Sequence, residues 1–248
     1  SLCAVKEKRN HTCLAYWSGG NELTDTYGVP VNYQNENIKM LKNIVSEYDH
    51  ERMFLPTSAS GPLEFLRIDK KGKNHDVHGP WKYLGVEQHY HTYNNSDSML
   101  QSEFGVDGMS SLDSLENFLS KENLKVVSMD KNQVWNHHGE WWDTLERDEM
   151  IFGKLENLEK FIVCSQFIQG EGLRYGIESN RRRIFQNTGS IIWQFNEPWP
   201  NVSNTCVLDY YNNPKKAYHY VKAAFEPIHV SMAYDKLIYK NDEKFVGK

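Results

Sequence analysis

Cys13-Leu14-Ala15-Tyr16-Trp17-Ser18-Gly19-Gly20-Asn21-Glu22 is the stretch that decides the fold. It joins a short apolar run to two glycines and ends on a carboxylate, which is the pattern of a buried strand opening into a polar loop. The same pattern recurs where Ser98-Met99-Leu100 leads into Gln101-Ser102-Glu103-Phe104-Gly105. In a parallel α/β barrel the strand ends meet on one face, which carries the active site. The sequence therefore predicts that Glu22 and Glu103 lie together on that face.

Strands and helices alternate outward from this stretch. We expect strands near residues 13, 54, 77, 99 and 191, and helices over residues 36–49, 155–183 and 214–225. This alternation is typical of a parallel α/β fold, but five strand–helix units fall short of the eight in a closed barrel. After Phe225 the alternating Ile228, Val230 and Met232 predict a strand of a β-sandwich.

The composition is that of a globular protein, and its low net charge favours a neutral ligand. Of the 248 residues, 39% are hydrophobic and 25% are charged, and the net charge is only -5. The longest basic run is Arg181-Arg182-Arg183, so we expect neither nucleic acid nor an anionic membrane as a partner. The apolar runs are too short for a membrane span. The many Trp and Tyr residues suit stacking against sugars.

The cysteines and histidines do not form a clear metal motif. The four cysteines are far apart and include no Cys-x-x-Cys pair, so they indicate neither a zinc site nor a disulfide framework. The pairs His75/His78 and His89/His91 have spacings that can chelate a metal, and in a strand the second pair would share one face. No carboxylate cluster accompanies them at a clear strand end. We therefore predict no metal and no cofactor.

Two carboxylates at one active-site face are the minimum equipment for hydrolysing a glycosidic bond. One protonates the leaving oxygen while the other attacks the sugar or activates water. A single glutamate at a strand end is more often a solvated loop residue. The interpretation therefore depends on finding Glu22 and Glu103 together.

Four motifs resemble those of glycoside hydrolase family 2, especially its β-mannosidase branch. The stretch from Asn10 to Glu22 resembles the acid/base motif of that family, and Ser102-Glu103-Phe104-Gly105 resembles its nucleophile motif. Residues 166–183 look like the helix before the last barrel strand. Residues 192–200, with the segments 208–218, 224–227 and 230–231 that follow, resemble the end of the catalytic barrel. The motifs occur in the family's order and cover nearly the whole chain.

The resemblance implies a (β/α)8 TIM barrel of which this chain holds strands four to eight. Residues 1–226 would be the C-terminal part of the catalytic barrel, and residues 227–248 would start an immunoglobulin-like β-sandwich domain. The chain would then be a fragment. Strands one to three and the N-terminal sugar-binding domains would belong to the full-length protein.

The resemblance also implies a retaining exo-β-glycosidase, most like a β-mannosidase, with Glu103 as nucleophile and Glu22 as acid/base. Asn21 would hydrogen-bond the sugar 2-hydroxyl, and Trp193 would be the stacking floor. The other substrate-binding candidates are His78, Trp81, His89, Asn196, Glu197 and Trp199. Glu197 stands where the family usually has aspartate, and Gly19-Gly20 stand where another asparagine is common.

Two alternatives stay open at this stage. The chain could be a carbohydrate-binding or inactive fragment of such an enzyme, or it could serve another sugar of the family, namely a β-galactoside, β-glucuronide or β-glucosaminide. The sequence does not fix the aglycone, the oligomeric state or the compartment, for which we lean to a periplasmic or extracytoplasmic location.

Overall fold

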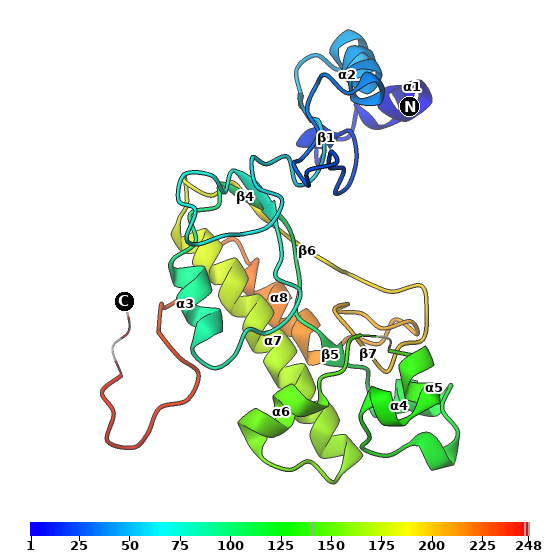
Figure 1. Cartoon of the computed structure of the whole chain (residues 1–248), viewed down its shortest axis with the longest axis vertical. Coiled ribbons are helices and arrows are strands. Elements are labelled where there is room, and N and C mark those ends of the chain that lie inside the picture. The colour runs from blue at the N-terminus through cyan, green and yellow to red at the C-terminus, as the bar shows by residue number, and fades with distance from the viewer. Residues whose placement is uncertain (140, 246, 248) are drawn as a thin grey trace. The chain divides into compact units, whose positions relative to one another are not determined.

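The structure is a computed structural model that describes residues 1–139, 141–245 and 247. It divides into two compact units (Figure 1). The first unit comprises Ser1–Gly79, Ser96–Glu103 and Gln186–Gly189. The second comprises Pro80–Asn95, Phe104–Phe185 and the chain from Ser190 onward.

Parallel strand pairs form the framework of the first unit. Strand β1 (Tyr16–Ser18) pairs in parallel with β2 (Met53–Leu55), and β3 (Asp76–His78) pairs in parallel with β4 (Leu100–Phe104). The pairing of β3 with β4 contains an irregularity between Val77 and His78. Strands β2, β3 and β4 lie where the sequence analysis predicts them, whereas β1 begins at Tyr16, after the predicted position near residue 13. Their parallel direction agrees with the predicted fold.

Two helices, α1 (Leu2–Lys8) and α2 (Glu36–Tyr48), belong to the same unit. Helix α2 begins at Glu36 because the side chain of Asn35 accepts hydrogen bonds from the backbone N–H groups of Asn37 and Ile38. Its apolar stripe, which includes Ile38 and Val45, packs with Val5 and Phe54 as a small core. This core supports strands β1 and β2, whose following loops carry residues of the site.

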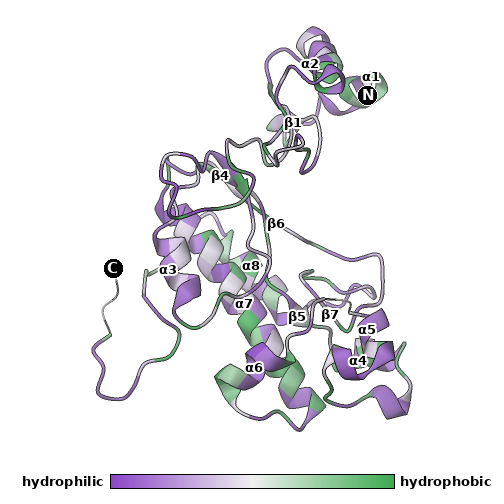
Figure 2. Cartoon of the chain, viewed as in Figure 1, coloured by the Kyte–Doolittle hydropathy of each residue, from purple (hydrophilic) through white to green (hydrophobic). Residues whose placement is uncertain are grey.

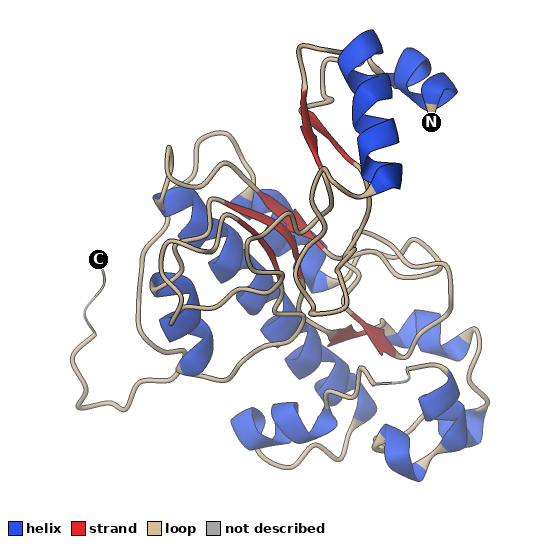
Figure 3. Cartoon of the chain, turned by 45° about the horizontal axis from the view of Figure 1, so that its top comes forward, coloured by secondary structure: helices blue, strands red, loops and turns tan. Residues whose placement is uncertain are grey.

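Helix α7 (Leu158–Arg182) is the central element of the second unit (Figures 1 and 3). Helices α3 (Gln88–Asn94), α6 (Leu145–Phe152) and α8 (Lys216–Ala224) pack against it. Helices α6 and α7 both mix hydrophobic and hydrophilic residues along their length (Figure 2), as helices that bury one face do. Two buried clusters form the core of this unit, one around Tyr90, Phe104 and Ile168 and the other around Trp135 and Phe161.

Shorter elements complete the second unit. Strand β5 (Gly108–Met109) pairs antiparallel with β7 (Ser203–Asn204). Strand β6 (Ser190–Ile192) lies at the strand predicted near residue 191. The remaining elements are α4 (Leu112–Glu116), α5 (Gln133–His137) and the 3-10 turns η1 (Lys121–Asn123) and η2 (Met129–Lys131). None of the described helices is long and apolar enough to cross a membrane.

Two local patterns differ in the structure from what the sequence suggested. His89-Tyr90-His91, in which a strand would place both imidazoles on one face, lies in helix α3, because Tyr90 and Tyr93 bury one helical face in the core of the second unit. The predicted β-sandwich strand after Phe225 is not formed over residues 227–233. Its side chains Ile228 and Val230 are 93% exposed, and a strand needs a partner strand to satisfy its backbone groups.

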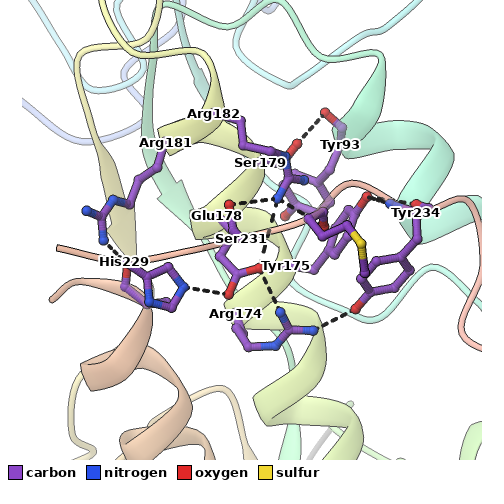
Figure 4. Close-up of polar contacts among 12 residues, drawn as sticks. Tyr93, Arg174, Tyr175, Glu178, Ser179, Arg181, Arg182, His229, Ser231 and Tyr234 are labelled. Carbon is purple, nitrogen blue, oxygen red and sulfur yellow. Dashed lines mark hydrogen bonds and ion pairs between the residues drawn. The ribbon is translucent and has the colours of Figure 1, made fainter. Parts of the chain in front are cut away.

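Polar contacts with α7 hold part of this C-terminal segment (Figure 4). His229 Nε2 lies 2.8 Å from Glu178 Oε1, and the hydroxyl of Tyr175 donates to the carbonyl oxygen of Tyr234 at 2.8 Å. Arg174 joins Glu178 to the Tyr234 hydroxyl, with hydrogen bonds of 2.7 Å and 2.6 Å. The segment is therefore fixed by side-chain hydrogen bonds and ion pairs in place of a sheet.

Candidate functional site

Glu22, His78 and Glu103 converge in the first unit. One ligand atom from each lies within 4.8 Å of the others. His78 Nδ1 is 2.8 Å from Glu22 Oε1 and 3.9 Å from Glu103 Oε2. The two carboxylates are thus as close as the sequence analysis expects, while their roles stay predictions.

The backbone around Glu22 is fixed by strand β2 and the turn after it. The N–H of Gly19 donates to the carbonyl of Leu55 at 2.9 Å, and the N–H of Glu22 donates to the carbonyl of Ser58 at 2.5 Å. Position 19 requires glycine because a Cβ there would lie 2.6 Å from the carbonyl oxygen of Pro56. Glu22 itself adopts a left-handed conformation with φ of 50°, which is strained for a residue with a side chain. Such strain is common at functional sites.

Strands β3 and β4 position His78 and Glu103, the other two residues of the site. His78 is opposite Glu103 in the parallel register. The imidazole of His78 is fully buried, whereas the side chains of Glu103 and Glu22 are 13% and 36% exposed. Both carboxylates can therefore reach a ligand, while His78 lies behind them.

A line of hydrogen bonds continues from His78 into the interior. Ser58 Oγ lies 2.9 Å from His78 Nε2 and 3.0 Å from Ser102 Oγ, and Ser102 in turn donates to Asp76. The backbone N–H and the hydroxyl of Ser60 both donate to the second oxygen of Asp76, at 2.8 Å and 2.9 Å. Sequence reasoning assigned no function to these residues. The only hint in the sequence is the run of turn-forming residues 57–61 after strand β2. That run predicts a turn but does not show that the turn reaches His78.

Nearby groups respond to the negative charge of this site. The pKa of Glu64 is raised, first by burial and then by the charge of Glu22, and His78 partly offsets the shift. Burial and, to a smaller extent, the charge of Asp76 raise the pKa of Tyr16. The site is therefore rich in carboxylates, with His78 among them.

Among the described residues, Glu22, His78 and Glu103 are also close enough to share a cation. The chelating pairs considered above do not form. His75 is exposed and its Nε2 lies 3.2 Å from the carbonyl oxygen of Gly72, while His89 and His91 lie on a helix. Because Nδ1 of His78 already contacts Glu22, we assign no metal, and the absence of a metal stays a prediction.

The other predicted site residues lie in the second unit, apart from Asn21, which is exposed and bridges to Ser58 in the first. Trp193 is half-buried. Its backbone N–H donates to the carbonyl of Phe104 at 2.7 Å, and its ring lies 6.0 Å from that of Trp142. Trp199 is 45% exposed and stacks on His138.

Two further candidates of that unit remain accessible to different degrees. Trp81 is partly buried, and Asn196 is exposed. Asn196 also forms a backbone bridge with Leu208. Neither observation assigns a role.

Glu197 and His89 are buried. Glu197 is 4% exposed and accepts a hydrogen bond of 2.6 Å from Asn201, and burial raises its pKa although Lys215 opposes the shift. His89 is fully buried, and its Nε2 lies 3.0 Å from the carbonyl oxygen of Gly172. Burial lowers the pKa of His89 to about 4, so it is a neutral core residue. Its prediction as a sugar-hydroxyl partner is wrong in this structure, because α7 covers it.

No protein-family profile matches the chain. The chain is similar to "Beta-mannosidase B" of Aspergillus fumigatus, with 24% identity over 259 aligned positions, covering 94% of this chain and 30% of that protein. "Beta-mannosidase B" of Aspergillus niger is 25% identical over 255 positions, covering 92% of this chain and 29% of that protein. The chain thus spans less than a third of the length of these curated relatives.

Solved structures show the same fold. The β-D-mannosidase of Dictyoglomus thermophilum aligns with a TM-score of 0.76 and 24% identity, covering 93% of this chain and 29% of that one. The exo-chitosanase of Amycolatopsis orientalis aligns with a TM-score of 0.70 and 20% identity, covering 94% of this chain and 28% of that one. By sequence and by fold, the chain resembles the β-mannosidase branch of glycoside hydrolase family 2.

Proposed function

We propose that the chain carries the catalytic carboxylates of a retaining β-glycosidase, with Glu103 as nucleophile and Glu22 as acid/base. The observation that supports this proposal most is the separation of the site's ligand atoms, which lie within 4.8 Å of one another. A retaining enzyme needs its two carboxyl groups about 5–5.5 Å apart, whereas an inverting enzyme leaves about 6.5–9.5 Å for a water molecule. The short separation favours direct attack by a carboxylate.

In the first step, Glu103 attacks the anomeric carbon while Glu22 gives its proton to the departing oxygen. The bond from the anomeric carbon to that oxygen breaks as the ester to Glu103 forms. In the second step, water attacks the same carbon, its proton passes to Glu22, and Glu103 leaves as a carboxylate. The greater exposure of Glu22, 36% against 13% for Glu103, suits the group that must meet both the leaving group and water.

A terminal β-mannoside is the substrate that the names of the relatives favour. Asn21 would contact the 2-hydroxyl, and Trp193 would stack on the sugar ring. Trp81, Asn196 and Trp199 are further binding candidates. Glu197 would act from a buried position, since Asn201 fixes one of its oxygens.

We also propose that β1, β2, β3, β4 and β6 correspond to barrel strands four to eight. The parallel pairing of β1 with β2 and of β3 with β4 supports this assignment. Residues outside these 248 would then supply strands one to three, in keeping with relatives more than three times as long.

Variants of the full-length protein that carries this chain test the proposal. Glu103→Ala should abolish hydrolysis of aryl β-mannosides, and azide should not restore a retained product. Glu22→Ala should keep activity on substrates with good leaving groups, because these need little protonation, and azide should then give the β-glycosyl azide. The exposed Glu51→Ala is the matched control and should behave as the parent.

Azide rescue in Glu103→Ala but not in Glu22→Ala would show that the roles of nucleophile and acid/base are reversed. Binding of sugar without turnover of any aryl glycoside would favour the alternative of a non-catalytic fragment. A panel of aryl β-mannoside, β-galactoside, β-glucuronide and β-glucosaminide assigns the sugar.

A further inference from the structure

The hydrogen bonds behind His78 form a chain with a defined end. Asp76 is 4% exposed and lies at the inner end of the chain, which runs through Ser102 and Ser58 to His78. At the outer end, Nδ1 of His78 is 2.8 Å from Oε1 of Glu22. We call Asp76, Ser102 and Ser58 the Asp76 chain.

The donors and acceptors fix the direction of every bond in the Asp76 chain. An ionised carboxylate can only accept, so Ser102 donates its single proton to Asp76. The contact of 3.0 Å between Ser102 and Ser58 therefore takes its proton from Ser58. Ser58 then has no proton left for His78, so it must accept one from Nε2 at 2.9 Å.

This direction sets the tautomer of His78. A neutral imidazole with its proton on Nε2 carries a lone pair on Nδ1, which can only accept. With His78 neutral, the proton in the 2.8 Å contact between Nδ1 and Glu22 belongs to Glu22. We propose that the Asp76 chain holds His78 in the Nε2–H tautomer, so that His78 keeps Glu22 protonated and ready to act as the acid.

This proposal rests on the proposed function and assigns positioning residues to it. Besides His78, the charged groups near Glu22 among the described residues include Glu103, within 4.8 Å, and Glu64, whose pKa responds to the charge of Glu22. Both repel a second negative charge, so they act in the same direction as the Asp76 chain. After Glu22 has given its proton to the leaving group, its carboxylate faces the lone pair of Nδ1. That repulsion favours uptake of a proton from the water that hydrolyses the glycosyl-enzyme.

The substitution Asp76→Asn tests this direction sharply. The backbone N–H of Ser60 donates to Oδ2 of Asp76 and cannot become an acceptor. The amide oxygen of the asparagine should take that place, which leaves its NH2 group facing Ser102. Ser102 would then donate to Ser58, Ser58 to Nε2, and the proton of His78 would move to Nδ1. Glu22 would be stabilised as a carboxylate.

Nuclear magnetic resonance of the full-length protein reads the tautomer without any substrate. Nitrogen-15 shifts of the His78 ring should show a protonated Nε2 and a bare Nδ1, and the carbon-13 shift of the Glu22 carboxyl should show the protonated acid. Asp76→Asn should exchange the two nitrogen signals. Ser60→Ala, which keeps the backbone N–H on Asp76, is the matched control and should retain the parental tautomer.

Kinetic measurements provide a second test of the Asp76 chain. In Asp76→Asn the alkaline limb of the pH profile of kcat/KM should move to lower pH. Hydrolysis of glycosides with poor leaving groups should fall by about tenfold or more, since general acid catalysis contributes at least that much. Glycosides with good leaving groups should change little. If Asp76→Asn does not fold, Ser102→Ala should give the same shift, because Ser58 loses its acceptor and can turn to donate to Nε2.

A proton on Nδ1 of His78 in the parent protein would overturn the proposal, as would an alkaline limb that does not move in either variant. The failure of the proposed function looks different. In that case no β-glycoside is hydrolysed, yet the nitrogen and carbon shifts still follow the expected pattern and support the role of the Asp76 chain.

Discussion

Glycine at position 19 shows how a residue without a side chain can position the proposed acid, Glu22, three residues later. A Cβ at this position would lie 2.6 Å from the carbonyl oxygen of Pro56, 2.8 Å from Ile38 and 2.9 Å from Phe54. Ile38 belongs to helix α2 and Phe54 to strand β2, and both are core side chains. The close approach lets the loop after β1 follow β2 as far as Glu22.

Gly19→Ala should therefore destabilise the first unit. Overpacking of this kind costs about 1–3 kcal/mol of unfolding free energy. Gly189→Ala is a control in the same unit, because a Cβ there would meet only Leu100 at an ordinary 3.4 Å. Urea unfolding followed by hydrogen exchange in the first unit compares the two variants. Equal stability of the two would mean that the loop can shift without loss.

Sequence alone could locate Glu22 and Glu103 because each belongs to a local motif at a strand end. The Asp76 chain could not be found in the same way, since Ser58, Ser102 and Asp76 are brought together by pairing of separate strands. The prediction that His89 contacts a sugar hydroxyl also depended on information outside its local sequence. The polar side chain suggested a role in sugar binding, but the packing of α7 over α3 buries it.

At the scale of elements, helix α2 was predictable because its apolar stripe and its capping residue Asn35 agree. Helix α3 was missed because His89-Tyr90-His91 is too short and too aromatic to reveal a period. The segment after Phe225 alternates like a strand, yet it forms none over 227–233, because its contacts are side-chain bonds to α7. An alternating pattern therefore predicts a strand only where a neighbouring strand is present to pair with it.

The burial of α3 against α7 makes the second unit sensitive to acid. The pKa of His89 is lowered from 6.5 to about 4 by burial, so below pH 6.5 the unfolded chain binds a proton that the folded chain does not. Stability contributed by neutral His89 is thus present above about pH 6.5 and is lost as the pH falls towards 4. The expected loss is about 3 kcal/mol between pH 7 and pH 4.

Urea unfolding of the parent, of His89→Gln and of His91→Gln over this pH range measures the effect. His89→Gln should show a shallower decline, while His91→Gln should keep the parental slope, because His91 is exposed on the same helix. Identical slopes for the parent and His89→Gln would show that another group causes the acid sensitivity.

At the scale of the whole molecule, the chain is short compared with the proteins it resembles. The alignment with the Dictyoglomus mannosidase covers 93% of this chain but only 29% of that protein. Within the described residues β1 pairs with β2 alone. An edge of this kind is normally paired or covered in natural folds.

We therefore expect the isolated 248-residue chain to be inactive or nearly so. It should also associate through its open strand edge or need the remaining strands in trans. The ratio of kcat/KM for aryl β-mannoside between this chain and the full-length protein measures the loss, with sedimentation reporting the association state. Comparable activity from a monomer would mean that these residues contain a complete site.

The left-handed backbone at Glu22 has a consequence for protein engineering. Glycine or asparagine would adopt this conformation more readily than glutamate, which is strained there by about 1–2 kcal/mol. A search for thermostable versions of this chain would thus be drawn to position 22 and would remove the proposed acid. Under the proposed function, stability and turnover would compete at this residue, so directed evolution should screen both properties together.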